Sequence, residues 1–280
     1  MNVGIVGYGT VGKSLFRIFR NTGHRVVIYD KYNPAFKGES HKDRINTCGL
    51  VFLAVPTPAG TDGPDLSAVE ECVSWIVAPI CLKSTVAPGT TNWLAQSTGK
   101  SIVFSPEYVG ETPFHPYRRV YNSEVVVVGG ERLAASRVVA LYQEVLGPMP
   151  RYFITDATTA ELAKYMENCY FATKIAFIAQ FHELAGKVGA DFEQMREVWL
   201  ADSRIGRSHS AIVGSPGFGG RCLPKDLDGI IKSGTKHGLR PQLLEAVQAY
   251  NEYLHAGSAR SGREADAEVA KLGKGSIQSN

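Results

Sequence analysis

Cys222 is the residue of this sequence whose type and surroundings most directly suggest chemistry. It lies near the end of a Gly- and Pro-rich segment, residues 214–224, and Pro224 after it indicates that a helix begins here. A thiol near a helix N-terminus, with Lys225 close by, is expected to have a lowered pKa and to be nucleophilic. Asp226, four residues further on, is near enough to act as a base or to polarise water. A buried structural cysteine is the alternative interpretation, because that is the usual state of a free cysteine.

Lys164 and Asn168 form a second pair of interest. They lie four residues apart in a stretch, residues 156–188, whose apolar residues recur at helical spacing. The two side chains are therefore predicted to share one face of a long helix. On spacing alone, a solvated Lys–Asn pair is the more ordinary interpretation.

A glycine-rich run, Gly7-Tyr8-Gly9-Thr10-Val11-Gly12, follows the first apolar segment and opens a helical one. This pattern is typical of a dinucleotide site: its glycines permit a tight turn, close approach of a pyrophosphate and close packing of helix on strand. The helix N-terminus then faces the anionic pyrophosphate. Asp30 closes the next strand and is expected to accept hydrogen bonds from the adenosine ribose, which favours NAD over NADP. Lys31 beside it softens that preference.

The first 150 residues alternate short β-rich runs with helix-like segments. The runs expected to form strands are residues 3–6, 25–29, 49–55, 80–83, 101–104 and 124–128. Several are continuously apolar, as parallel strands covered on both faces are. The alternation predicts a doubly wound α/β domain over residues 1–150.

The pattern becomes helical in the second half of the chain. Helical segments are expected over residues 156–188, 192–200, 225–237 and 241–254, and we place a helical domain at residues 151–255. The last residues, 256–280, are rich in Gly, Ser, Lys and Ala and are expected to form a mobile or weakly helical polar tail.

The composition limits the classes of protein to consider. The chain has 280 residues, 44% hydrophobic and 20% charged, which fits a folded protein of about two domains. Its net charge of +3 suits small anionic ligands and is too weak to argue for a nucleic-acid partner. The sequence shows no apolar run of the roughly 18 residues that a membrane helix needs. With no signal peptide expected, five scattered cysteines indicate reduced thiols in the cytoplasm, and their spacing suggests no metal site.

These segments together resemble one family, the UDP-glucose/GDP-mannose dehydrogenases. The resemblance covers about residues 1–255 and implies a Rossmann-like doubly wound parallel sheet followed by an all-helical dimerisation domain. The motifs that carry it are Gly7–Gly12, Val55-Pro56-Thr57-Pro58, Lys83-Ser84-Thr85-Val86, Ser105-Pro106-Glu107-Tyr108, Glu161-Leu162-Ala163-Lys164 with Asn168, Arg204-Ile205-Gly206, and Gly217-Phe218-Gly219-Gly220-Arg221-Cys222-Leu223-Pro224-Lys225-Asp226.

The resemblance implies a reaction as well as a fold. Family members oxidise a nucleotide-sugar alcohol to a carboxylate in two NAD-dependent steps, through a thiohemiacetal and then a thioester on a cysteine that Cys222 matches. Lys164 and Asn168 would stabilise the developing oxyanion and hold an ordered water, with Asp226 beside that water and the thiol. Glu107 and Thr85 match residues assigned to hydrolysis and water positioning. UDP-glucose is the leading substrate, with GDP-mannose and N-acetylhexosamine nucleotides as close rivals.

The resemblance also implies binding residues and a partner. Arg204 would reach substrate in a neighbouring subunit, which implies a homodimer built on the helix at residues 156–188. The expected cofactor contacts are Gly7, Tyr8, Gly9, Thr10, Val11, Gly12, Asp30, Lys31, Val55, Pro56, Thr57, Thr85, Glu111 and Lys225. The expected substrate contacts are Glu107, Tyr108, Lys164, Asn168, Arg204, Gly217, Phe218, Gly219 and Cys222.

The sequence departs from the family in several places. Family members carry a further α/β domain after the helical region, whereas about 25 polar residues follow that region here. The segment between Asp30 and Gly49 is short, and Arg221 and Leu223 stand where serine and phenylalanine are common. A compact enzyme, a fragment, and a protein whose substrate is held by a dimer partner all fit these departures.

Two other functions stay open at this point. One is a two-electron dehydrogenase of the β-hydroxyacid or 6-phosphogluconate kind, which also uses a Lys–Asn pair. Cys222 with Lys225 and Asp226 argues against it, because a single oxidation needs no nucleophile. The other is a non-catalytic NAD-binding dimeric module, against which the joint presence of Lys164, Asn168, Cys222 and Asp226 counts.

Overall fold

The computed structural model describes residues 1–108, 124–214 and 216–257 of the chain. The chain divides into two compact units, the first covering Met1–Tyr165 and the second beginning at Met166. Among the described residues, no helix has the combination of length and apolar character needed to cross a membrane.

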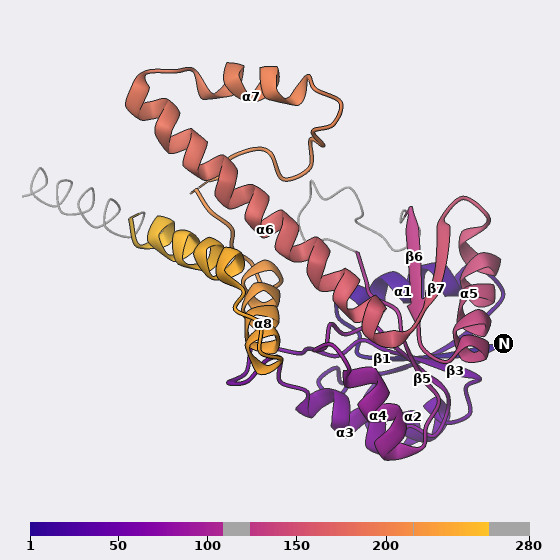
Figure 1. The fold of residues 1–280 in the computed structure, drawn as a ribbon. Helices are drawn as coiled ribbons and strands as arrows, with labels where there is room; N and C mark the ends of the chain where they lie inside the picture. Colours follow the sequence, from indigo (N-terminus) through magenta and orange to yellow (C-terminus); the bar gives the residue numbers. More distant parts are fainter. Residues whose placement is uncertain (109–123, 215, 258–280) are drawn as a thin grey trace, which may run out of the picture. The chain divides into compact units, whose positions relative to one another are not determined.

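The first unit is built on a seven-stranded sheet with the order β2-β1-β3-β4-β5-β6-β7 (Figure 1). Neighbouring strands run parallel except β5 and β6, which pair antiparallel between Phe104 and Gly129. The strands are β1 (Asn2–Val6), β2 (Arg25–Tyr29), β3 (Leu50–Leu53), β4 (Ile80–Leu82), β5 (Ile102–Phe104), β6 (Val125–Gly129) and β7 (Arg151–Thr155). The mostly parallel α/β sheet confirms the predicted fold class, and all six expected strands are present.

The sequence analysis missed β7 and began the helical domain at residue 151. In the structure β7 is an edge strand that pairs in parallel with β6 over its whole length. Phe153 and Ile154 are exposed, so this strand is not a continuously buried apolar run. The sheet therefore extends five residues past the predicted boundary.

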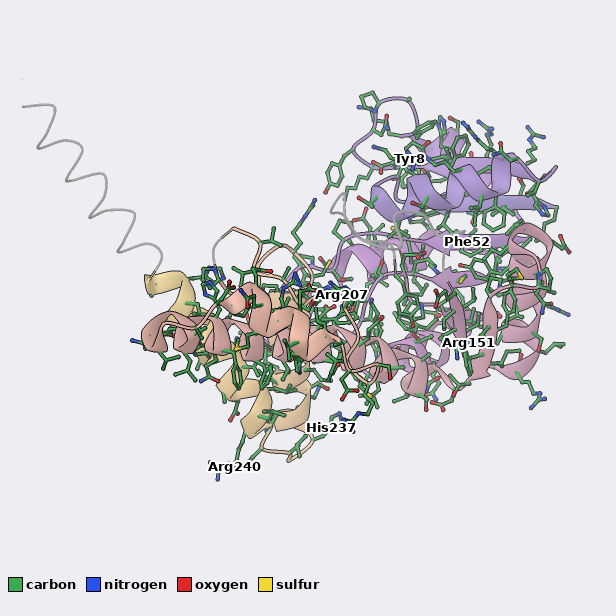
Figure 2. All side chains as sticks on the ribbon, turned by 90° about the horizontal axis from the view of Figure 1, so that it is seen from above. Tyr8, Phe52, Arg151, Arg207, His237 and Arg240 are labelled. Carbon is green, nitrogen blue, oxygen red and sulfur yellow. The ribbon has the colours of Figure 1, made fainter. Side chains whose placement is uncertain are left out.

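Helices cover both faces of the sheet. Figure 1 shows α2, α3 and α4 together on one side of the strands, and α1 and α5 pack on the other. Their bounds are α1 (Thr10–Arg20), α2 (Glu39–Ile45), α3 (Ser67–Trp75), α4 (Thr90–Thr98) and α5 (Arg132–Leu146). Two apolar layers result, one on each face. Phe52, labelled in Figure 2, lies in the layer under α1 and α5 and contacts the rings of Phe19 and Tyr142.

The helices of the second half follow the predicted pattern closely. They are α6 (Ala157–Val188), α7 (Phe192–Leu200) and α8 (Leu223–Lys236), and residues 242–257 are also helical. In the second unit a small core forms where Cys169, Ala172 and Ala176 of α6 pack with Phe218 and Leu227. Residues 256 and 257, the first two of the predicted tail, are helical, and the remainder of that tail lies outside the described residues.

Candidate functional site

The glycine-rich loop joins β1 to α1 in the conformation that its sequence predicts. Gly7 has φ 91°, and a Cβ there would lie 2.3 Å from the carbonyl oxygen of Ala54 at the end of β3. A Cβ on Gly12 would lie 2.0 Å from the carbonyl oxygen of Gly7. These two glycines are therefore required by the packing of the loop itself.

Gly9 differs from its two neighbours because nothing lies within 4 Å of a Cβ built on it. It is the N-cap residue of α1, and no side chain caps this helix end. The loop lies at the carboxyl ends of β1 and β3, between which the strand order reverses, and such a switch point is where doubly wound sheets bind ligands. Open backbone at an uncapped helix N-terminus fits the pyrophosphate of NAD.

Asp30 is held firmly at the end of β2. Its Oδ2 accepts a hydrogen bond from the backbone N–H of Tyr8 at 2.7 Å, which ties β2 to the glycine loop. Its Oδ1 accepts from the N–H groups of Tyr32 and Asn33, both at 2.9 Å. Lys31 instead forms an exposed ion pair with Glu71 at 2.7 Å. The effect of Lys31 on the preference for NAD stays a prediction.

The other residues expected at the cofactor follow β3 and β4. Thr57 is buried, and its hydroxyl donates to the carbonyl of Thr85 at 2.7 Å, so the structure brings these two predicted residues together. The carbonyl of Val55 accepts from Ser84 Oγ at 2.6 Å, and Pro56 is exposed. These bonds fix the loop after β3 against the loop after β4. Glu111 lies outside the described residues.

Glu107 and Tyr108 follow β5 and face different cations. The carboxylate of Glu107 lies 3.4 Å from the ammonium of Lys83, and both side chains are almost fully buried. The ammonium of Lys164 lies over the ring of Tyr108, 4.7 Å from its centroid. Lys164 is itself buried, so the aromatic face helps to hold its charge.

Glu161, one turn before Lys164, fixes the start of α6. Its buried carboxylate accepts hydrogen bonds from the N–H of Gly89 at 2.6 Å, and from the N–H and hydroxyl of Thr91 at 2.9 and 2.6 Å. It thus satisfies donors at the N-terminus of α4. Burial raises the pKa of Glu161, partly offset by these bonds from Thr91 and Gly89. The motif analysis included this residue but gave it no role.

In the second unit, Asp226 is the centre of a buried polar cluster. Its Oδ2 accepts from the amide Nδ2 of Asn168 on α6, and its Oδ1 accepts from the ammonium of Lys225, both at 2.5 Å. Asp226 is 2% exposed and Asn168 is 8% exposed. Three predicted site residues therefore meet in one hydrogen-bonded group, joined from α6 and α8.

Cys222 is the N-cap residue of α8 and is exposed, whereas the four other cysteines are buried. The backbone N–H of Asp226 donates to its carbonyl at 2.9 Å, so the acid lies one helical turn from the thiol residue. Burial raises the pKa of Cys72, Cys81 and Cys169 to about 12, and Asp226 adds to the effect on Cys169. Position and exposure therefore single out Cys222 as the accessible thiol.

The loop before Cys222 is anchored by a residue that sequence reasoning missed. Asn251 accepts from the N–H of Phe218 at 2.7 Å and donates to its carbonyl at 3.0 Å. Gly217 has φ 102°, and a Cβ there would lie 2.7 Å from Asn251 Oδ1. Nothing lies within 4 Å of a Cβ on Gly219. Phe218 is buried in the core, so it serves packing at least as much as binding.

Arg204 projects from the segment after α7, with its side chain 86% exposed and paired to Asp202 at 2.5 Å. The following backbone is held by Lys174 of α6, whose ammonium donates to the carbonyls of Gly206 and Ser208. Lys174 is buried, and burial lowers its pKa. The sequence analysis assigned it no role.

Comparison with known families gives the context for this geometry. One family model, described as the UDP-glucose/GDP-mannose dehydrogenase NAD-binding domain, matches residues 35–146, and the model of the same family's central domain matches residues 158–253. The chain belongs to this family. The match confirms the resemblance and the NAD-binding character of the first domain, although the glycine loop itself precedes the matched range.

Similar proteins agree with this assignment. A UDP-glucose 6-dehydrogenase of Pseudomonas aeruginosa is 33% identical over 221 residues, which cover 72% of this chain and 48% of that protein. The solved UDP-glucose dehydrogenase of the archaeon Pyrobaculum islandicum has a TM-score of 0.80 at 28% identity, covering 90% of this chain and 68% of that one. A 3-hydroxyisobutyrate dehydrogenase of Mycobacterium tuberculosis, at 18% identity and a TM-score of 0.70, shares the fold alone.

The chain spans about half the length of the Pseudomonas relative and about two thirds of the Pyrobaculum structure. Its match comprises the NAD-binding and central domains of the family.

Proposed function

We propose that this protein oxidises the C6 alcohol of a nucleotide sugar to the uronic acid in two NAD-dependent steps, with UDP-glucose as the substrate. The observation that carries this proposal is the group formed by Asn168, Asp226 and Lys225 beside the exposed Cys222 at the start of α8. A single alcohol oxidation would need no nucleophilic thiol. An oxidation to the acid can use one, because an aldehyde must form an adduct or a hydrate before it can lose hydride, and a thiol supplies the adduct.

The first oxidation requires a place for the negative charge that develops on the alcohol oxygen. We assign Lys164 to this charge, since it is a buried cation. Asn168 lies four residues further along the same helix and binds a water through the part of its amide not used by Asp226. When bound, NAD supplies the acceptor for the hydride in each of the two oxidations. Asp30 and the glycine loop hold its adenosine half, and Thr57 and Thr85 lie on the loops that enclose it.

Cys222 then captures the aldehyde. Its thiolate adds to the aldehyde carbon to give the anion of a thiohemiacetal, and loss of hydride in the second oxidation converts this anion to a thioester. Water adds to the thioester carbonyl, the C–S bond breaks, and Cys222 leaves as the thiolate. Glu107 accepts the proton of that water, and Asp226 maintains the polar environment that keeps the thiolate and the water in place.

We also propose a homodimer formed through α6. One face of this helix carries a row of exposed apolar side chains, called here the α6 stripe: Met166, Tyr170, Phe177, Phe181, Leu184 and Val188. Their spacing of three, four or seven residues places them on one side of the helix. An exposed apolar row of this length favours a second copy as its cover. In such a dimer Arg204 reaches the substrate of the partner subunit.

The test of the proposed function is product analysis. Wild-type protein incubated with NAD and UDP-glucose is expected to yield UDP-glucuronate, detected by mass spectrometry. Cys222→Ala is expected to yield none, while its NAD affinity stays within about twofold of wild type. GDP-mannose and UDP-N-acetylhexosamines, tested in parallel, decide the sugar. Acid formation by the Cys222→Ala variant would rule out the covalent route.

A further inference from the structure

Lys83 is a buried lysine to which the proposed function gives no role. It follows β4, and its neighbours across the sheet are the residues that follow β5, because Leu82 pairs with Phe104 in the parallel register. The backbone N–H of Ser105 donates to the carbonyl of Leu82 at 2.9 Å. The ends of two adjacent strands therefore bring Lys83 beside Ser105, Pro106 and Glu107.

The ammonium of Lys83 has a full set of neutral acceptors. It donates to the hydroxyl of Tyr142 on α5 at 2.9 Å, to Ser105 Oγ at 3.2 Å and to the carbonyl of Pro106 at 3.3 Å. These bonds use its three N–H donors. They fix the cation in place without involving the Glu107 carboxylate as a hydrogen-bond partner.

Glu107 supplies the negative charge opposite this cation. Its Oε2 lies 3.4 Å from the ammonium, and the two side chains are 8% and 3% exposed. Its Oε1 accepts from the N–H of Tyr108 at 2.9 Å. Oε2 is buried and has no hydrogen-bond partner among the described residues. The hydrogen bond to Oε1 therefore orients the carboxylate, and the charge of Lys83 holds Oε2. Oε2 still has a lone pair that can accept a proton.

The surroundings keep Lys83 charged. Burial alone would lower the pKa of Lys83, but Tyr142 and Glu107 raise it by more, so the pKa lies above its ordinary value. The same burial raises the pKa of Tyr142 well above its ordinary value, so this phenol stays neutral, and it raises the pKa of Cys81 to about 12. Glu107 is thus the anion that faces this cation. A buried charge without such a partner is strongly destabilising.

We propose that Lys83 is a positioning residue for hydrolysis: it holds the carboxylate of Glu107 in the place and orientation in which it can take a proton from the attacking water. The inference rests on the proposed function, since it concerns the thioester formed on Cys222. In that step the water oxygen forms a bond to the carbonyl carbon, the C–S bond breaks and the electron pair leaves with sulfur. One proton of the water goes to Glu107 and the other stays with the new acid.

The test separates hydrolysis from the two oxidations by rapid mixing of enzyme, NAD and UDP-glucose. Lys83→Met is expected to keep a burst of about two NADH per active site, because the steps before the thioester remain. Its steady-state rate should fall about 100-fold, the size of a lost general base. The adduct on Cys222 should then accumulate and be visible by intact-mass spectrometry. Lys83→Arg, which keeps the charge, should recover part of the steady-state rate.

Lys100→Met is the matched control. Lys100 is a lysine of the same unit whose ammonium donates to the backbone carbonyls of Val73 and Ser74, away from Glu107. Its burst and steady-state rate should equal those of wild type. A Lys83→Met variant whose burst and steady-state rate fall together, or stay unchanged, would overturn the inference.

A double variant keeps the inference testable if Lys83→Met does not fold. Lys83→Met combined with Glu107→Gln removes both buried charges, so no unpaired ion remains. If Lys83 acts only through Glu107, this double variant should have the same steady-state rate as Glu107→Gln alone. A further tenfold loss would contradict the inference. Wild-type protein that reduces no NAD with any of the sugars would instead overturn the proposed function, and the inference with it.

Discussion

At the residue scale, the chemistry that we propose depends on one exposed thiol among five cysteines. Cys222 lies at the start of α8, and the N-terminal end of a helix favours an anion. The other four are buried, and each has its pKa raised by burial. A thiol whose pKa is about 12 is ionised to only about one part in 10,000 at pH 8, so it reacts slowly with alkylating agents.

Alkylation therefore provides a direct prediction. Iodoacetamide at pH 8 should modify Cys222 at least about tenfold faster than Cys72, Cys81 or Cys169, because only the thiolate reacts and only Cys222 is exposed. Peptide mass spectrometry over a time course measures the rates. Labelling of Cys81 as fast as that of Cys222 would show that this ranking of the thiols is wrong.

We assign the preference for NAD over NADP to Asp30. Its carboxylate is held by three backbone N–H groups, and its charge repels a 2′-phosphate. Asp30→Asn should lower the ratio of NAD affinity to NADP affinity about tenfold, which corresponds to about 1.4 kcal/mol. Asp65→Asn, whose carboxylate also accepts a backbone N–H, is the control and should leave the ratio unchanged. Fluorescence titration with both cofactors gives the ratio, and an unchanged ratio in Asp30→Asn would remove its assigned role.

At the element scale, the site depends on strand ends and loops held by buried polar side chains. Glu161 joins α6 to the start of α4, and Asn251 holds the loop before α8 through both backbone groups of Phe218. Lys174 holds the backbone after Arg204. Each residue acts by satisfying backbone donors or acceptors, so each fixes the position of a segment that carries predicted site residues.

A substitution at Gly217 tests whether Asn251 holds the loop before α8. Gly217→Ala should destabilise the protein by about 1–3 kcal/mol, because φ there is positive and the new Cβ would meet Asn251 Oδ1 at 2.7 Å. Gly219→Ala is the matched control and should be nearly neutral, since nothing lies within 4 Å. Thermal unfolding of the two variants provides the comparison. Equal stability of both would mean that Asn251 does not fix the loop.

The sequence predicted the helices and strands better than the buried polar side chains that hold the loops between them. Six strands and the helices of the second half follow from apolar patterning and glycine positions. The edge strand β7 was missed because its outward side chains break the apolar run. Asn251 and Lys174 were missed because their partners are backbone groups 32 to 34 residues away, which local spacing does not reveal. Lys83 was quoted only as part of a motif, and its ion pair with Glu107 depends on the register of β4 and β5.

At the scale of the whole molecule, the α6 stripe bears on assembly. Wild type should sediment as a dimer at micromolar concentration. The double variant Met166→Glu/Leu184→Glu should sediment as a monomer, because a dimer of the variant would desolvate the two new charges of each subunit in its interface. Lys187→Glu, which also places a new carboxylate on α6 but removes no apolar surface, should stay dimeric. A monomeric wild type would remove the basis for the role of Arg204 in a partner subunit.

The central claim is that two successive oxidations pass through one thiol, and the stoichiometry of the reaction tests it most directly. With UDP-glucose limiting and NAD in excess, the account predicts about two NADH formed per sugar consumed, as a covalent intermediate that is oxidised before release requires. A ratio near one, with the aldehyde or another two-electron product released, would contradict it and leave Cys222 without a role in the reaction.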